Sequence, residues 1–208
     1  DCAYCAQSCR SNADIDTYKW VEDEKLYNDN DFVNEHHLSR HCIGLSGMGF
    51  TDAEIEQLAG RIRKMKETGT HLCCSIGFLT EKQAKMLKDA GLDRINHNLN
   101  SSRNYYSHIC TTHTFDQRVE NIHMLQRLGF EICSGGIIGM GESKEDVVDM
   151  LLELKEINPE ALPINFLLPI PGTPLGDQDI SGLTYEYGIK VLCLARLLVP
   201  QSDIRCAA

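Results

Sequence analysis

The stretch LSRHCIGLSGMGFTDAEIEQLAGRIRKMKETGTHLCCSIGFL (38–79) decides the fold class. Its first part, LSRHCIGL (38–45), predicts a strand, and HLCCSIGFL (71–79) predicts a second one. Between them TDAEIEQLAGRIRKMKETG (51–69) predicts a helix that begins with a capping box of Thr51 and Glu54. Because strands that are joined through a helix run parallel, this unit predicts an α/β fold.

The same alternation of strand and helix continues to the end of the sequence. Four more strands are expected, at 94–100, at 161–170, at 202–207 and within 130–141, where a loop follows the strand. Helices are expected at 80–91, 115–129, 143–157 and 184–198, and a more polar N-terminal part contains one helix around 22–37. About six parallel strands therefore alternate with helices.

A doubly wound sheet and a (β/α) barrel share this rhythm, but the predicted strands carry polar residues that a sheet buried on both faces would not tolerate. We therefore expect residues 1–208 to be a single domain, a TIM-type (β/α) barrel. Since about eight βα units close such a barrel, the first strand and the last βα unit are expected to lie outside the sequence.

Composition narrows the classes of function. The chain has 208 residues, 42% of them hydrophobic, and a net charge of −10, which argues against a nucleic-acid surface. No apolar run approaches the roughly 18 residues of a membrane span. Ten cysteines are scattered along the chain rather than arranged as a disulfide framework. We therefore expect a cytoplasmic protein that binds neither nucleic acid nor membrane.

Polar side chains recur at alternate positions of the predicted strands, which places them on one face. Such sets are Arg40 with Cys42, Cys73 with Ser75, and Asp203 with Arg205. The amides Asn96, Asn98 and Asn100 form another set. One buried cysteine is most often a small core residue. Several beside arginine and asparagine instead point to a site in the interior, because such polar groups need partners when they are buried.

The N-terminal stretch DCAYCAQSC (1–9) contains a CxxC pair, Cys2 and Cys5. This spacing lets two sulfurs face a common centre. It serves a redox disulfide, a zinc site or an iron–sulfur cluster equally well, so the pair alone leaves these alternatives open.

Six motifs in order carry a resemblance over the whole chain: DCAYCAQS, SRHCIGL, NHNLN, CSGGIIGMGE, PINFLLPIPGTPL and SDIRCAA. They resemble the biotin synthase family of radical S-adenosylmethionine (SAM) enzymes. The resemblance implies a TIM-type barrel and a sulfurtransferase that inserts sulfur into dethiobiotin. It would use a 5′-deoxyadenosyl radical and a sacrificial second iron–sulfur cluster. We expect the 208 residues alone to be inactive.

The resemblance implies a site for a 4Fe–4S cluster and SAM. Cys2 and Cys5 match the second and third cysteines of the CxxxCxxC motif, whose first cysteine would precede Asp1. Asn100 stands where the family usually has an aspartate that binds the ribose hydroxyls. The other residues that match SAM contacts are Tyr4 and Gly136 with Gly139 at the adenine, Asn98 at the ribose, and Arg118 at the carboxylate.

The resemblance also implies a second cluster, expected to be 2Fe–2S, on Cys42, Cys73, Cys133 and Arg205. Arg40 matches a supporting residue beside it. Cys206 is an alternative fourth ligand, because thiolate is a better iron ligand than guanidinium. Strand alternation favours Arg205, since a bulge would be needed to turn Cys206 inward.

Three amides, Asn96, Asn98 and Asn165, match the residues that bind the ureido ring of dethiobiotin. The implied partners are a flavodoxin- or ferredoxin-like electron donor and a second copy in a homodimer. Two other functions stay open: a radical SAM enzyme with a different substrate, and a non-catalytic iron–sulfur or zinc-binding fragment.

Overall fold

The computed structural model describes residues 1–207. The chain divides into two compact units. Unit 1 contains residues 1–16, 98–120 and the chain from residue 133 onward, and unit 2 contains residues 17–97 and 121–132. The expectation of a single domain stays a prediction.

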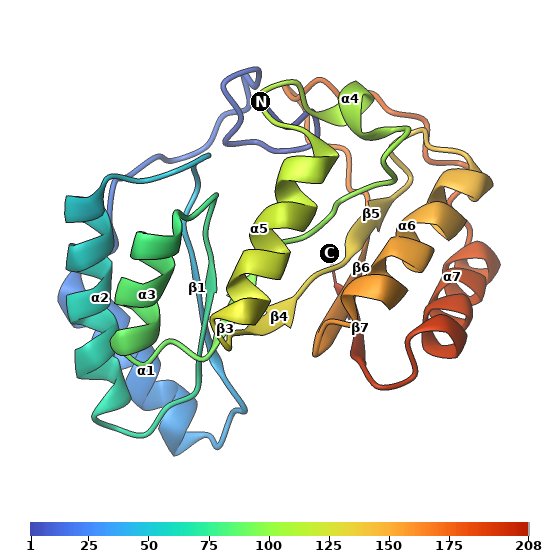
Figure 1. Cartoon of the computed structure of the whole chain (residues 1–208). Helices are drawn as coiled ribbons and strands as arrows, with labels where there is room; N and C mark the ends of the chain where they lie inside the picture. The colour runs from blue at the N-terminus through green and yellow to red at the C-terminus, as the bar shows by residue number, and fades with distance from the viewer. Residues whose placement is uncertain (208) are drawn as a thin grey trace. The chain divides into compact units, whose positions relative to one another are not determined.

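Unit 2 begins with helix α1 (Asp23–Glu35) and continues as two strand–helix pairs and one more strand. Strands β1 (His41–Gly44), β2 (Leu72–Ser75) and β3 (Arg94–Asn96) pair in parallel, each with the next. Helices α2 (Asp52–Lys66) and α3 (Glu81–Asp89) follow β1 and β2 and lie side by side (Figure 1). The strand–helix–strand unit that the sequence predicts at 38–79 is confirmed.

Local hydrogen bonds explain where these helices begin. The Thr51 side chain accepts from Glu54 N, and the Glu54 side chain accepts from Thr51 N, so the predicted capping box is confirmed. Thr80 and Gln83 form a second such box at the start of α3. Each box satisfies N–H groups that lack a partner within the helix, which fixes the first turn.

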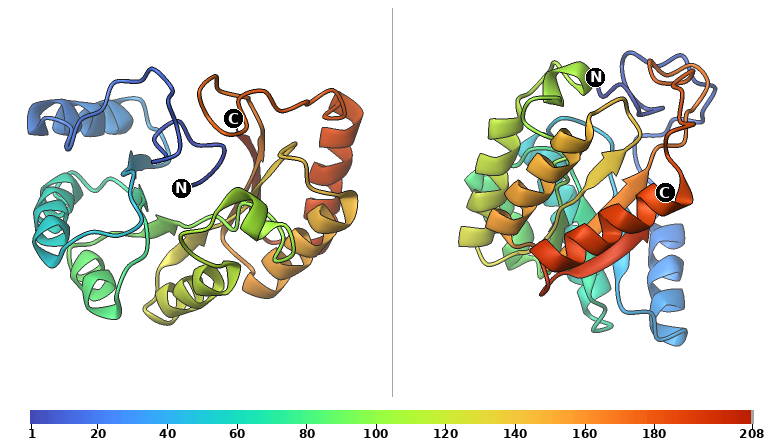
Figure 2. Two further views of the ribbon diagram at one scale, coloured as in Figure 1. Left: turned by 90° about the horizontal axis from the view of Figure 1, so that it is seen from above. Right: turned by 90° about the vertical axis from the view of Figure 1, so that its right-hand side faces the viewer.

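Unit 1 contains the C-terminal strands and the helices that cover them. Helix α6 (Lys144–Ile157) lies beside α7 (Tyr185–Leu198), and Figure 2 shows both on one side of the neighbouring strands. Helix α5 (Phe115–Arg127) and strand β4 have residues in both units. The remaining elements are α4 (Tyr106–Ile109), β4 (Glu131–Cys133), β5 (Gly136–Ile138), β6 (Ala161–Phe166) and β7 (Asp203–Ala207).

At 130–141, where one strand followed by a loop was expected, the structure has two short strands, β4 and β5, separated by Ser134–Gly135. Both segments still pair with β6, through Cys133 opposite Ala161 and Gly136 opposite Ile164. Strand β7 pairs with β6 as well. In unit 2 strands β1, β2 and β3 are neighbours in the order of the sequence, and in unit 1 strands β5, β6 and β7 are, as in a barrel. In a doubly wound sheet the order reverses. The parallel α/β fold is confirmed, and a partial TIM-type barrel agrees with this order.

The expected strand at 94–100 is too long, because β3 ends at Asn96. Asn100 has a φ of 72°, a left-handed conformation that asparagine tolerates and a strand does not. Asn98 and Asn100 therefore follow the strand, and the expectation that they share a strand face with Asn96 is wrong. Helix α4 was not expected, since its four residues are too few to show a period.

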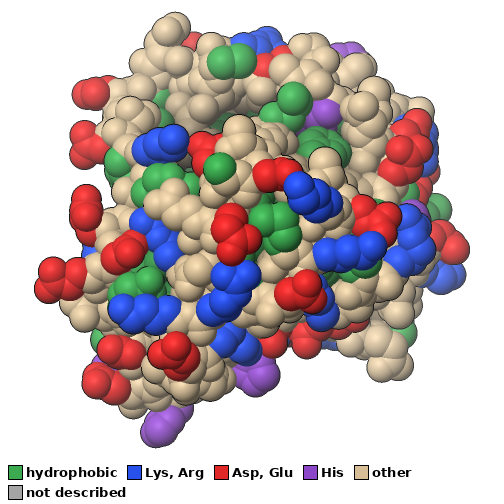
Figure 3. Space-filling view, turned by 60° about the vertical axis from the view of Figure 1, so that its left-hand side comes forward, with side chains coloured by type: hydrophobic (Ala, Val, Ile, Leu, Met, Phe, Trp, Pro, Cys, Tyr) green, Lys and Arg blue, Asp and Glu red, His purple; other side chains and the backbone are tan. Residues whose placement is uncertain are grey.

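The surface view in Figure 3 shows acidic and basic side chains interspersed on the face that it presents, with small apolar areas between them. In the described part of the chain, no helix combines the length and apolarity needed to cross a membrane.

Candidate functional site

The N-terminal cysteines lie in a turn that is fastened to unit 1. Cys5 N donates to Cys2 O at 3.3 Å, so the two residues close a tight turn. Between them Ala3 is 2% exposed, donates to Ile109 O and accepts from Leu175 N. Cys2 and Cys5 are only half-buried. The turn therefore has a fixed backbone, while both cysteines stay partly exposed.

Tyr4 lies between these cysteines and contacts Cys2. Burial raises the pKa of the Tyr4 phenol well above its usual value, and the Cys2 side chain adds to the shift. The nearby Arg118 opposes it in part. The structure thus brings three residues of the expected SAM and cluster site, Cys2, Tyr4 and Arg118, into one neighbourhood of unit 1.

The Arg118 guanidinium is surrounded by acceptors. Its Nη1 donates to Asn98 O at 3.0 Å, its Nε donates to Tyr106 Oη, and its Nη2 lies 3.0 Å from His113 Nε2. Burial raises the pKa of Tyr106 to about 12, so this phenol is neutral at physiological pH. Burial, together with Arg118, lowers the pKa of His113 to about 4, so this imidazole is neutral as well.

Two predicted amides hold the backbone of the glycine loop. Asn98 Oδ1 accepts from Gly135 N at 3.0 Å, and Asn165 Nδ2 donates to Gly136 O at 3.2 Å. Asn100 joins them through its backbone, since its N donates to Gly135 O at 3.1 Å. The three asparagines and the break between β4 and β5 therefore form one connected site in unit 1.

Close packing explains why glycines are needed here. A Cβ on Gly136 would lie 2.0 Å from Met150 Sδ, and one on Gly139 would lie 2.9 Å from Leu183 Cδ2. Gly139 also has a φ of 97°, which favours glycine. The sequence-based expectation that these glycines contact an adenine stays a prediction, and packing within unit 1 is a further reason for them.

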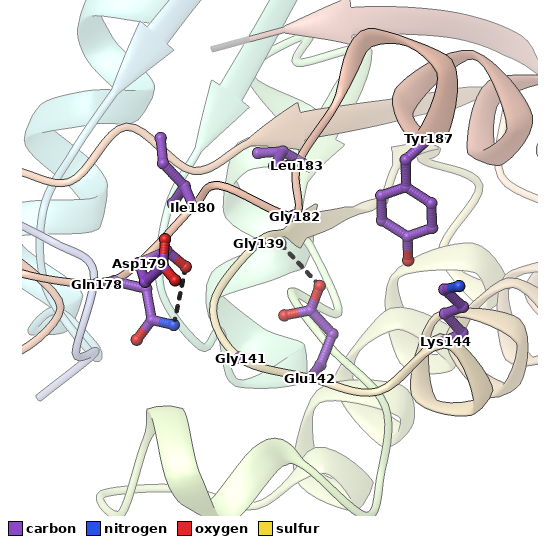
Figure 4. A pocket seen from close by; sticks show the side chains of 10 residues that line it. All are labelled: Gly139, Gly141, Glu142, Lys144, Gln178, Asp179, Ile180, Gly182, Leu183 and Tyr187. Carbon is purple, nitrogen blue, oxygen red and sulfur yellow. Dashed lines mark hydrogen bonds between the residues drawn. The ribbon is translucent and has the colours of Figure 1, made fainter.

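Glu142 stabilises the turn that follows β5. Its carboxylate accepts from Gly139 N at 2.7 Å and from Met140 N at 2.8 Å. Burial raises the pKa of Glu142, although the backbone hydrogen bonds work against that shift. The turn borders a pocket of about 220 Å³, into which Figure 4 shows the Glu142 carboxylate and the Tyr187 phenol pointing.

The strand cysteines of unit 2 are aligned by the backbone ladder. Cys42 on β1 lies opposite Cys73 on β2, and Cys73 lies opposite Arg94 on β3. Cys42 is exposed and Cys73 is 3% exposed. Cys74, the next residue of β2, points to the other side of the sheet, and its complete burial raises the pKa of its thiol to about 12.

Two arginines beside these thiols share one carboxylate. Glu131 Oε2 accepts from Arg40 Nη2 at 2.9 Å and from Arg94 Nε at 2.9 Å. The Arg40 and Arg94 side chains are 14% and 10% exposed, whereas the Glu131 side chain is 43% exposed. This charged triad leaves a net charge of +1 near Cys42 and Cys73, which suits anionic thiolates.

The other predicted ligands of a second cluster belong to unit 1. Cys133 is buried at the end of β4. Arg205 on β7 is 45% exposed and donates to Asp203, with which it shares a strand face as expected. Cys206 is exposed, and its backbone lies opposite Ile164. Asn96, at the end of β3, belongs to unit 2.

The donor sets fit the groups that the resemblance implies. Cysteine thiolates are the usual ligands of iron–sulfur clusters, and the structure offers them as two pairs, Cys2 with Cys5 and Cys42 with Cys73. Within residues 1–207 no three His, Cys, Asp or Glu side chains are arranged to hold a single metal ion. The ligands of a cluster bind different iron atoms and lie further apart than the ligands of one ion.

Several residues of the site were not expected from the sequence. His113 and Tyr106 contact Arg118, Glu142 holds the glycine turn, and Glu131 pairs with Arg40. Glu142 ends the quoted motif CSGGIIGMGE, which was a signal for its role. No periodicity or spacing marks the other three, because the folded chain brings them to their partners.

Two family models match successive parts of the chain. The model of the radical SAM superfamily matches residues 1–154. The model of the biotin and thiamin synthesis associated domain matches residues 163–208.

Two similar curated proteins are biotin synthases of Bacillus species. The chain is 40% identical to biotin synthase of Bacillus cytotoxicus and 41% identical to that of Bacillus subtilis strain 168, in each case over 99% of the chain. It spans about 61% of the length of each of these relatives.

Solved structures share the fold at low sequence identity. Methylornithine synthase (PylB) superposes with a TM-score of 0.83 at 20% identity, over 98% of this chain and 59% of that one. The maturase HydG superposes with a TM-score of 0.77 at 15% identity, over 98% of this chain and 49% of that one. The superfamily model implies a 4Fe–4S cluster and SAM as cofactors. The chain belongs to the radical SAM superfamily.

Proposed function

We propose that the chain carries the catalytic barrel of a biotin synthase, an enzyme that inserts sulfur into dethiobiotin. Identity of 40% to biotin synthases and the match to the biotin and thiamin synthesis associated domain support this proposal. The activity belongs to the full-length protein, of which the chain spans about 61% of the length of its relatives.

One observation is the main support for the proposal. Cys42 lies opposite Cys73 on neighbouring parallel strands, next to two arginines that share Glu131. An enzyme that only abstracts hydrogen needs no second set of thiolates. A set that holds a sacrificial cluster is needed where sulfur is inserted. We assign Cys42, Cys73, Cys133 and Arg205 to that cluster, with 2Fe–2S as its expected type.

Cys2 and Cys5 would hold the 4Fe–4S cluster, and Arg118 would bind the SAM carboxylate. Guanidinium suits this role, because it remains charged and offers several donors in a fixed plane. When bound, the cluster would supply the electron for reductive cleavage of SAM, and the resulting 5′-deoxyadenosyl radical would be the species that removes hydrogen from dethiobiotin. Tyr4, Asn98, Asn100, Gly136 and Gly139 would line the rest of the SAM site.

Asn98 and Asn165 would bind the neutral ureido ring of dethiobiotin. Because Gly135 N donates to Asn98 Oδ1, the Asn98 Nδ2 group is left to act as a donor toward a ligand. Because Asn165 Nδ2 donates to Gly136 O, the Asn165 Oδ1 atom remains as an acceptor. A ureido ring offers one carbonyl acceptor and two N–H donors, which complement this pair. Asn96 would complete the substrate site.

Two partners are part of the proposal. A reductant of the flavodoxin or ferredoxin type would supply electrons, and a second copy of the chain would complete a homodimer. The cytoplasm is the proposed compartment, because the assigned thiolates require reducing conditions.

The test uses the full-length protein, reconstituted with iron and sulfide without oxygen and incubated with SAM, dethiobiotin and a reductant. Formation of both biotin and 5′-deoxyadenosine is expected. In Cys73→Ala, biotin should fall below detection while SAM cleavage continues, because Cys73 belongs to the second thiolate set. Cys193→Ala, which removes an exposed cysteine on α7, is the control and should retain both products.

Three results would contradict the proposal. SAM cleavage without biotin in the unmodified protein would point to a radical SAM enzyme with another substrate. Bound zinc without iron–sulfur absorption would point to a non-catalytic binding protein. Full biotin formation by Cys73→Ala would remove the second thiolate set from the mechanism.

A further inference from the structure

A chain of hydrogen bonds leads away from Arg118 toward the N-terminal turn. It starts at Arg118 Nη2, which lies 3.0 Å from His113 Nε2. Since a guanidinium has only donors, His113 Nε2 must be the acceptor, and the proton of this neutral imidazole is therefore on Nδ1. The direction of the first bond thus fixes the tautomer of His113.

The second bond follows from that tautomer. His113 Nδ1 lies 3.2 Å from Thr112 Oγ1, and its N–H donates to that hydroxyl oxygen. Thr112 Oγ1 in turn donates to Asp1 Oδ1 at 2.9 Å. Every bond from Arg118 to Asp1 therefore points in one direction and ends on a carboxylate, which is an acceptor only.

The Asp1 carboxylate is held by further donors of the same segment. It accepts from Thr111 N at 3.0 Å, from Thr112 N at 3.2 Å and from Cys110 Sγ at 3.2 Å. Asp1 directly precedes Cys2, so these bonds fasten the cysteine turn to the segment that carries His113. All of these residues belong to unit 1.

We propose that His113 is a positioning residue that holds Arg118 in a fixed relation to the Cys2–Cys5 turn, through Thr112 and Asp1. SAM would bind the cluster through its amino and carboxylate groups. An arginine that binds the same carboxylate must therefore be held at a fixed distance from the cysteine turn. Asn98 O and Tyr106 Oη hold two sides of the guanidinium, and His113 holds the third. This inference rests on the proposed roles of Arg118 and the cysteine turn.

The test measures SAM affinity in the full-length protein, reconstituted without oxygen, by isothermal titration calorimetry. His113→Leu removes the acceptor and should weaken SAM binding about 10-fold, which corresponds to about 1.4 kcal/mol. His113→Gln keeps an acceptor near the position of Nε2 and should recover most of the affinity. His113→Asn keeps an acceptor only near the position of Nδ1, which is too far from Arg118, so this variant should bind SAM as weakly as His113→Leu.

His108→Leu is the matched control, because His108 lies on the same segment, is exposed and stacks on Tyr105 instead. It should bind SAM as the unmodified protein does. Iron content and thermal unfolding are measured for every variant. The EPR spectrum of the reduced cluster is recorded with and without SAM. A positioning role predicts normal iron content with a weaker response of that spectrum to SAM in His113→Leu.

The possible failures are distinguishable. If the unmodified protein has a cluster but does not bind SAM, the proposed function fails. If it binds SAM and His113→Leu binds SAM equally well, the role of His113 is refuted. An equal loss of affinity in His113→Gln and His113→Leu would also refute it, because the acceptor would then not matter.

Discussion

The glycine and asparagine site of unit 1 and the strand cysteines of unit 2 are held in place by different forces. In unit 1, amide side chains and bare glycine backbone contact each other closely around Gly135 and Gly136. In unit 2, the thiols lie beside a charged triad in which Arg40 and Arg94 share Glu131. The first arrangement depends on close packing and amide hydrogen bonds, and the second combines the backbone ladder with a charged triad.

This difference has consequences for mutation and pH. A site that is fixed by close packing tolerates no added atoms, because dense interiors relax only partly. A site that is fixed by ion pairs tolerates changes of shape but responds when one charge is removed or titrated. Substitutions that add atoms and substitutions that remove a charge therefore test whether the two units respond differently.

The largest effect is expected for Gly135→Ala in unit 1. A Cβ at this position would lie 1.8 Å from Pro163 O, so the backbone must move. We expect a loss of about 3 kcal/mol in the free energy of unfolding, measured with urea. Gly60→Ala in α2 is the control, because a Cβ there meets nothing within 4 Å, and a gain of about 1 kcal/mol is expected. Equal stability of the two variants would break the comparison.

The next effect is expected for Glu131→Gln in unit 2. Without the carboxylate, two largely buried guanidinium groups face each other without compensation. A loss of about 2 kcal/mol is expected, below that of a fully buried pair because Glu131 is 43% exposed. Glu56→Gln, which removes the exposed partner of Arg63, should change stability by less than about 0.5 kcal/mol. Similar values for both variants would show that burial of the arginines does not matter.

A smaller effect that depends on pH is expected at Asp93. Burial alone would raise the pKa of Asp93, but hydrogen bonds from Leu72 N and Lys66 Nζ outweigh it and lower the pKa. The stabilisation from this carboxylate is therefore present above the unfolded pKa of about 3.9 and is lost as the pH falls through the lower folded value. Asp93→Asn should lose about 1 kcal/mol at pH 7.

The measurement for Asp93→Asn is the free energy of unfolding between pH 3 and pH 7. The difference between the variant and the unmodified protein should shrink as the pH falls. Asp89→Asn, which removes an exposed carboxylate on α3, serves as the control for a change of net charge. A difference that stays constant down to pH 3 would contradict the account of Asp93.

The smallest effect, with the opposite sign, is expected at Glu142 in unit 1. Burial raises the pKa of Glu142, so the stability linked to its protonated form is complete below the unfolded pKa of about 4.3. That stability is lost as the pH rises through the folded value. The stability of Glu142→Gln relative to the unmodified protein should therefore increase from pH 4 to pH 7. If it decreases instead, the backbone hydrogen bonds from Gly139 and Met140 outweigh burial.

Some elements could be predicted because their causes are local. The Thr51–Glu54 capping box and the strand and helix around it were predicted because they depend on residues three or four apart. The strand at 94–100 was predicted too long, because the asparagines alternate with other residues while Asn100 adopts a left-handed backbone. Asn100 pairs with Gly136, which is 36 positions away in the sequence and therefore outside the stretch from which the strand was predicted.

The candidate site, too, could be predicted only in part from the sequence. Arg118, Asn98 and Asn165 were named from the family resemblance. In the structure Arg118 donates to Asn98 O, and the side chains of Asn98 and Asn165 form hydrogen bonds with the glycine loop. Tyr106 and His113 were not named, because their contacts with Arg118 follow from the path of the segment around α4. The role of each residue toward cofactor and substrate stays a prediction.

The succession of strands and helices can be predicted from the sequence, because apolar periodicity and helix caps act within a few residues. Which polar groups meet depends instead on how the folded chain brings distant residues together. Asp1 accepts from Thr112 across 111 positions, and Arg40 donates to Glu131 across 91 positions. Such pairs form because buried donors and acceptors must be satisfied by whatever partner the fold brings near.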